Sequence, residues 1–136
     1  MRIISSTGSE LMLLDTRAGL EDLHRQLQLF LASAEGEVEL PAEQDGSPAP
    51  YDAFLPGLQV RKTVGPILLS QLPSGWLRLE GSPENLRRYV SHFSFPVGQE
   101  SGHRHPENND APGYLSKRSL SLVIEADSTW SPSGAA

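Results

Sequence analysis

The sequence contains no cysteine. This absence excludes a disulfide framework, and it also excludes thiolate metal sites and thiol nucleophiles. Long hydrophobic runs are missing as well, because no apolar stretch reaches the length of a signal-peptide core or of a membrane-spanning helix. We therefore expect a cytoplasmic protein that does not act at a membrane.

Common catalytic signatures are also absent. No serine stands in a Gly-x-Ser-x-Gly elbow, and no glycine-rich loop has the spacing that cradles a phosphate. The sequence therefore predicts a protein that works by binding, with no catalytic residues and no cofactor.

Composition and charge indicate one globular domain with a protein partner. The chain has 136 residues, of which 38% are hydrophobic and 21% charged, which suffices for a self-supporting core. The formal net charge is −6, and residues 1–56 hold ten acids against only three bases. An acidic half repels nucleic acid and attracts basic proteins, although such a charge can also serve solubility alone.

Two segments have the spacing of amphipathic helices. Over residues 17–33 the apolar side chains recur on one face, and Thr16 can cap the first turn. The second helix begins after Ser82 with Pro83 and Glu84, a strong start signal, and is expected to end near Phe95-Pro96.

The remaining pattern is typical of short strands. Strands are expected at 11–14 and 37–40, in a β-meander over 58–63, 66–71 and 76–80, in an edge strand at 103–107 and in a final strand at 119–126. A loop at 42–50 is expected to be flexible, and a tail at 131–136 to be disordered. The expected fold is a single α+β domain over 1–136, with two helices packed on antiparallel sheet.

The two halves of the chain, 1–65 and 66–130, resemble each other at an offset of 66 residues. Leu11 then matches Leu77, Thr16 matches Ser82, and Leu58 falls on Ile124. Each half reads β-β-α-β-β, which suggests a tandem duplication with pseudo-twofold symmetry. Shared apolar spacing between unrelated strand–helix units is the alternative.

One cluster could bind a metal. On an extended strand His103, His105 and Glu107 share one face, because side chains alternate with a period of two. Two imidazoles and a carboxylate suit zinc, iron or manganese, so a metal-dependent enzyme is one alternative function. We expect instead that these residues and Arg104 contact a partner.

The run Leu77 to Leu86, the triplet His103-Arg104-His105 and the strand Ser119 to Ile124 resemble the Immunity protein 32 family. That family comprises predicted immunity proteins of bacterial toxin–antitoxin competition systems. The resemblance covers residues 76–130 and implies a cytoplasmic protein that binds and neutralises a cognate toxin.

The acidic half is expected to supply part of the attraction for that toxin. The side chains proposed for this role are Glu35, Glu37 and Glu39, which lie in or beside a loop, where binding contacts are commonly built. An adaptor or structural domain is the remaining alternative, and the sequence leaves the oligomeric state open.

Overall fold

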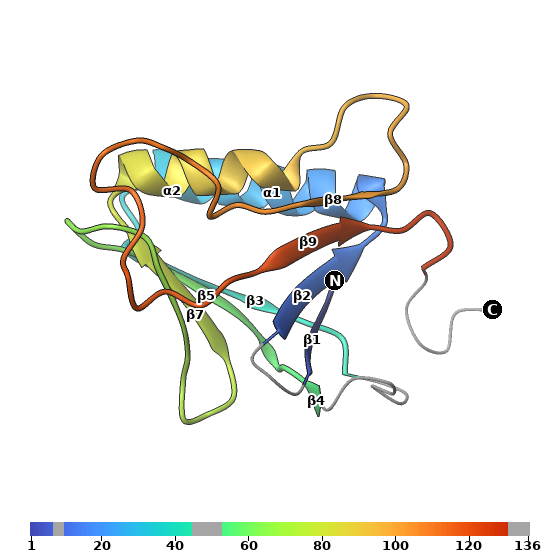
Figure 1. Ribbon diagram of the computed structural model, residues 1–136, viewed down its shortest axis with the longest axis horizontal. Coiled ribbons are helices and arrows are strands. Elements are labelled where there is room, and N and C mark those ends of the chain that lie inside the picture. The colour runs from blue at the N-terminus through green and yellow to red at the C-terminus, as the bar shows by residue number, and fades with distance from the viewer. Residues whose placement is uncertain (7–9, 45–52, 131–136) are drawn as a thin grey trace.

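The structure is a computed structural model that describes residues 1–6, 10–44 and 53–130. Two helices lie side by side over two β-sheets (Figure 1). Most of the predicted loop 42–50 and the tail 131–136 lie outside the described residues. The strands are β1 (Arg2–Ser6), β2 (Glu10–Asp15), β3 (Glu37–Pro41), β4 (Ala53–Phe54), β5 (Gly57–Lys62), β6 (Leu68–Gln71), β7 (Leu77–Gly81), β8 (Gly102–Arg104) and β9 (Val123–Ala126).

Both predicted helices and both predicted caps are confirmed. Helix α1 spans Arg17–Ala32, and the Thr16 hydroxyl accepts the Gly19 N–H at 3.1 Å. Helix α2 spans Pro83–Val90, and the Ser82 hydroxyl accepts the Asn85 N–H at 3.2 Å. Each cap satisfies a donor that the helix itself cannot pair, which is worth about 1 kcal/mol. Helix α2 ends before Phe95, because residues 91–93 tighten into a 3₁₀ turn.

The two helices pack on two mixed sheets, so the α+β class is confirmed and the antiparallel pairing is not. The five-stranded sheet has the order β4-β1-β2-β9-β8, and the four-stranded sheet has the order β3-β5-β7-β6. At the centre of each sheet two strands run parallel, β2 with β9 and β5 with β7. The predicted meander over 58–80 is therefore wrong, since β7 lies between β5 and β6.

Two strands are much shorter than predicted, and one was not predicted. The edge strand β8 stops at Arg104, and β9 begins only at Val123. Residues 119–120 instead bond to β6 of the other sheet, because the Leu69 N–H donates to the Ser119 hydroxyl and the Leu120 N–H donates to the Leu69 carbonyl. Strand β4 was not predicted from the sequence.

Strand order and register match the expected duplication. Moving β1 and β2 forward by 66 residues places them on β6 and β7, and the pairing Ile3↔Leu13 becomes the observed pairing Leu69↔Leu79. Apart from β4, each sheet then combines two strands of one half with two of the other, in the same order. These are the relations that a twofold axis between the halves requires.

The final strand follows a different offset from the one predicted. Leu13 pairs with Ile124, and the equivalent Leu79 pairs with Val60, so Val60 and not Leu58 corresponds to Ile124. The offset between β5 and β9 is thus 64 residues. With that offset, the hydrogen bond from the Thr63 N–H to the Gly81 carbonyl matches the bond from the Asp127 N–H to the Asp15 carbonyl.

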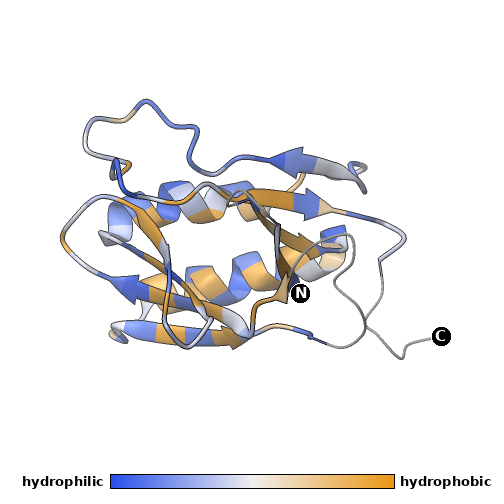
Figure 2. Ribbon diagram, turned by 60° about the horizontal axis from the view of Figure 1, so that its bottom comes forward, coloured by the Kyte–Doolittle hydropathy of each residue, from blue (hydrophilic) through white to orange (hydrophobic). Residues whose placement is uncertain are grey.

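The core lies between the helices and the sheets. In Figure 2 orange and blue alternate along both helices, as expected when one face of each helix is buried. Leu20 and Leu27 of α1 and Leu86 and Phe93 of the second helical segment are almost completely buried. Within the described residues, no helix combines the length and apolarity needed to cross a bilayer.

Candidate functional site

The outer face of the five-stranded sheet carries an apolar strip. Leu11 and Leu13 point into the core, so Met12 and Leu14 of the same strand point outward. The strand registers align further outward side chains with these two in rows across the sheet. One row reads Phe54, Ile4, Met12 and Val123, and the next reads Arg2, Leu14, Glu125 and His103.

The equivalent face of the four-stranded sheet is polar. The positions equivalent to Ile4, Met12 and Val123 carry polar side chains. Its corresponding rows are Ser70, Arg78, Gln59 and Glu39, and Leu68, Glu80, Arg61 and Glu37. Arg78 donates a hydrogen bond to Gln59 at 2.6 Å, as expected for a face in contact with water.

The comparison between the two faces has a functional meaning. Backbone pairing is the same in both sheets. The fold therefore does not require apolar residues at these outward positions. The four-stranded sheet has them, and the five-stranded sheet has Ile4, Met12, Leu14 and Val123 instead. Apolar side chains that gather on a sheet face and are rimmed by polar ones commonly mark an interaction site.

Sequence reasoning missed this strip, although the sequence contains a signal. Residues 11–14 form an unbroken apolar run, whereas the equivalent residues 77–80 alternate as Leu-Arg-Leu-Glu. An unbroken run is typical of a strand covered on both faces. Only the alternating strand has the pattern of a sheet with one solvated face.

A hollow of about 630 Å³ lies at one end of the strip. Its floor includes Met12 and Val123, and the predicted cluster forms one side of its rim. His103, His105 and Glu107 all line it, so the prediction that they share one face is confirmed. The described residues that line the hollow are Ile4, Glu10, Leu11, Met12, His103, His105, Glu107, Ser119, Leu120, Ser121 and Val123.

Each of the two histidines faces one carboxylate. His103 Nε2 lies 3.5 Å from Glu125 Oε1, and His105 Nδ1 lies 3.9 Å from Glu107 Oε1. Both imidazoles are about half exposed. In the part of the chain that the structure describes, no three His, Asp or Glu side chains converge closely enough to hold a metal ion. The geometry therefore gives no support to the metal-dependent alternative.

Glu107 is held differently from the other carboxylates of the rim. Its Oε2 atom is buried and has no hydrogen-bond partner among the described residues, and the same is true of the Tyr89 hydroxyl. Burial raises the pKa of Tyr89, and the negative charge of Glu107 raises that pKa further. The nearby Tyr114 hydroxyl donates to the Pro106 carbonyl, which fixes the segment that presents Glu107.

Arg104 does not belong to this face. It lies between His103 and His105 on the strand, so its side chain points the other way. Its guanidinium donates to the Ser94 carbonyl at 3.1 Å and lies over the Phe95 ring at 5.8 Å. This arrangement ties β8 to the segment that follows α2.

The predicted acidic residues lie on the other sheet. Glu35 stands in the turn after α1, and Glu37 and Glu39 are exposed on the edge strand β3. The histidine cluster begins in β8, which is the equivalent edge strand of the five-stranded sheet. The structure therefore places the two predicted sets on different sheets and does not bring them together.

Aromatic rings border the other end of the apolar strip. The Arg2 guanidinium lies 4.8 Å from the centroid of the Phe54 ring and 5.9 Å from that of Trp130. Such cation–π contacts hold the rings in place over the sheet. The strip thus runs from an aromatic border to the histidine and glutamate rim.

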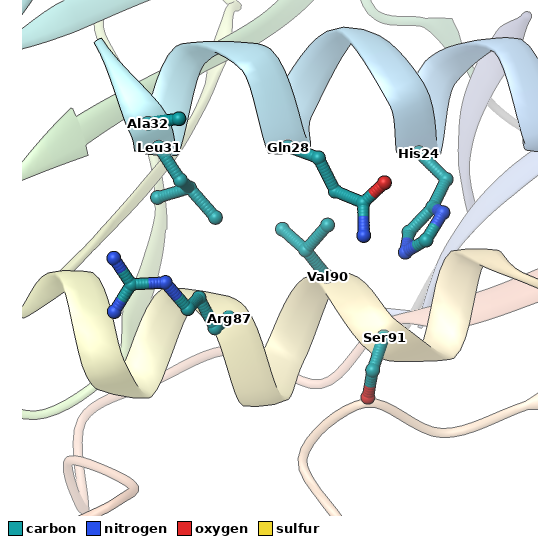
Figure 3. A pocket seen from close by; sticks show the side chains of 7 residues that line it. All are labelled: His24, Gln28, Leu31, Ala32, Arg87, Val90 and Ser91. Atoms are coloured by element: carbon teal, nitrogen blue, oxygen red, sulfur yellow. The ribbon is translucent and has the colours of Figure 1, made fainter.

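A second, smaller hollow lies between the two helices. Figure 3 shows His24 and Gln28 of α1 and Val90 of α2 pointing into it, with Arg87 nearby. Its volume is about 300 Å³, roughly half that of the hollow on the sheet. The only carboxylate that contacts its histidine is Glu21, 3.7 Å away within the same helix, among the described residues. The sheet face is therefore the stronger candidate.

Comparisons of the chain with protein-family models, curated proteins and solved structures found no significant match. The resemblance to the Immunity protein 32 family therefore stays a prediction.

Proposed function

We propose that this protein is an immunity-type inhibitor, which binds a toxin domain through the outer face of the five-stranded sheet and neutralises it without catalysis. The observation that supports the proposal most is the contrast between two structurally equivalent faces. One is polar and fit for water, and the other offers the partly exposed Met12, Leu14 and Val123 around the buried Ile4, between charged and aromatic borders. An apolar centre with a polar rim is the usual anatomy of a protein–protein interface.

The segments that resemble the immunity family support the same surface. His103 and His105 belong to the resembling triplet, and both lie at the rim of the hollow. The resembling strand Ser119 to Ile124 supplies Val123 of the apolar row.

Replacing Met12 by arginine tests the proposal. Arginine is the residue that the equivalent position 78 carries, so the substitution should leave the fold intact. It should abolish protection of cells that express the toxin encoded beside this gene, and weaken binding about 100-fold or more, because a central apolar contact is replaced by a buried charge. Calorimetry on the purified pair measures the affinity.

Ser70→Arg is the matched control. Position 70 corresponds to Ile4 on the polar face, so this variant adds the same charge to the other sheet. We expect it to bind and protect like the wild type. If both arginine variants protect cells fully, or if no complex with the neighbouring toxin forms at all, the proposed function is wrong.

The acidic residues on β3 have a separate expected role. Glu35, Glu37 and Glu39 are exposed and lie away from the apolar strip, so they can act on an approaching basic partner only at long range. Changing all three to glutamine should slow association with the toxin by about 2- to 10-fold at low salt and leave dissociation unchanged. Stopped-flow association rates measured against ionic strength check this. Equal rates and equal salt slopes would show that these charges serve solubility alone.

A further inference from the structure

We infer that the hollow on the five-stranded sheet receives one basic side chain of the bound protein, a lysine or an arginine, with its aliphatic stem on the apolar floor and its cation between Glu10 and Glu107. The inference rests on the proposed function, because it assigns the cation to the protein partner. It goes further by stating which chemistry the partner must present.

The charges of the hollow favour a cation. The described residues that line it include two glutamates and no lysine or arginine. On the helix side, Arg88 is already engaged, since it donates to Glu84 Oε1 at 2.8 Å and to Asn85 Oδ1 at 2.9 Å. An anionic group would be repelled by both glutamates of the hollow, whereas a cation would be attracted by both.

The position of the two glutamates defines a place for the cation. Glu10 begins β2, and Glu107 follows the edge strand β8, so the two stand on opposite sides of the segment that leads into β9. Ser121, which also lines the hollow, lies on that segment. A cation placed over Ser121 therefore has a carboxylate on either side and a hydroxyl acceptor below.

A bound cation stabilises the Glu107 carboxylate more than it would stabilise a fully solvated one. One of its carboxylate oxygens is buried and accepts no hydrogen bond from the described residues. A negative charge that is partly removed from water is poorly compensated, and its attraction for an opposite charge is screened less. His105, at 3.9 Å from the other oxygen, provides compensation only when it is protonated.

The floor of the hollow suits a long aliphatic stem. Met12 and Val123 are adjacent across the parallel pair, and Ile4 lies next to Met12 on the other side. Lysine and arginine commonly bury their methylene groups along such apolar surface while the charged end reaches a polar rim. A short or branched apolar side chain would cover the floor but leave both carboxylates unpaired.

Small probes test this chemistry without the toxin. We propose to titrate N-acetyl-arginine methylamide and the neutral N-acetyl-norleucine methylamide into protein that carries ¹³C-methyl methionine. The chain has two methionines, so Met12 reports on the hollow, and Met1, which lies outside it, serves as an internal control. The arginine probe should shift the Met12 methyl signal saturably and bind about tenfold more tightly than the norleucine probe.

Charge variants locate the cation. Glu107→Gln keeps the shape of a partly buried side chain, and Glu10→Gln changes an exposed one, so both should fold. Each should weaken the arginine probe about three- to tenfold and leave the norleucine probe unchanged. Glu80→Gln, which removes the same charge from the polar face, should change neither probe. The inference is overturned if norleucine binds as tightly as arginine, if neither Gln variant has an effect, or if Met12 does not respond up to the solubility limit of the arginine probe.

The toxin complex separates this inference from the proposed function. If the toxin occupies the hollow with a basic side chain, the arginine probe should no longer shift Met12 in the complex. A toxin that binds through Met12 yet leaves the probe free to bind would overturn the inference alone. If the arginine probe binds but the protein recognises no toxin, the proposed function is refuted. The cation-binding chemistry of the hollow is then still supported, and its ligand is a free cationic molecule in place of the partner's side chain.

Discussion

Truncating Leu13 to alanine should lower the free energy of unfolding by about 3 kcal/mol, and truncating Leu79 should lower it by a similar amount. Both side chains are fully buried, and each stands in a central strand between two apolar neighbours. Leu13 pairs with Ile3 and Ile124, and the equivalent Leu79 pairs with Leu69 and Val60. Chemical denaturation of both variants measures the two losses.

A surface substitution provides the control for this pair. Glu80→Ala lies on the same strand as Leu79 but points outward, so it should change stability by no more than about 0.5 kcal/mol. If one leucine variant loses several times more stability than the other, the two halves are packed differently. Their equivalence would then be limited to the backbone.

Replacing Gly19 by asparagine should also lower stability by about 3 kcal/mol, because there is no room for a side chain beneath the first turn of α1. A Cβ atom at Gly19 would lie only 2.1 Å from Asp15 Oδ1. That carboxylate is almost buried, accepts the Thr16 N–H at 2.7 Å and lies 3.0 Å from the Met1 amine. The substitution would displace it and break these contacts.

The second half of the chain suggests how to rescue this variant. The positions equivalent to Asp15 and Gly19 are Gly81 and Asn85, so the polar side chain and the glycine have exchanged places. At Gly81 the close neighbour is Ile67, whose Cδ1 would lie 2.8 Å from an added Cβ, and the Asn85 amide instead donates to the carbonyls of residues 65 and 113 at 3.4 and 3.3 Å.

Adding Asp15→Gly to Gly19→Asn should therefore restore part of the lost stability, although Asp15→Gly alone is destabilising. Thermal or chemical unfolding of the two single variants and the double variant measures this coupling. A double variant no more stable than its Gly19→Asn parent would show that the two helix starts are not interchangeable. An unchanged stability in Gly19→Asn would mean that Asp15 moves aside at little cost.

Elements fixed by local chemistry could be predicted from the sequence. Helices α1 and α2 follow from apolar spacing and from the hydroxyls of Thr16 and Ser82, which act within a single turn. The half-buried character of β7 follows from the alternation of residues 77–80. The common side of His103 and His105 follows from the alternation of an extended chain, whereas Glu107 reaches the same hollow from the turn after β8.

Strand partners could not be predicted, because they depend on residues far apart in the chain. Nothing near Leu58 shows that β5 pairs with β7 and not with β6. The same limit applies to the site. The floor of the hollow requires Ile4, Met12 and Val123 to meet, and they come from three strands whose order only the fold decides. Arg104 was grouped with the histidines as a partner contact, although the alternation that brings His103 and His105 together turns its side chain to the opposite face, against Ser94 and Phe95.

The exchange of strands between the halves has a kinetic consequence for a nascent chain. All strands of the four-stranded sheet lie between residues 37 and 81, whereas the five-stranded sheet pairs Met12 with Val123. Contacts between such distant residues slow folding. At about 5–20 residues per second of synthesis, the inner edge of β2 would stay unpaired for roughly 2–10 s after β7 has been made. During that interval the apolar run of β2 is an open sheet edge, so chaperone depletion should aggregate newly made chains far more than it affects the finished protein.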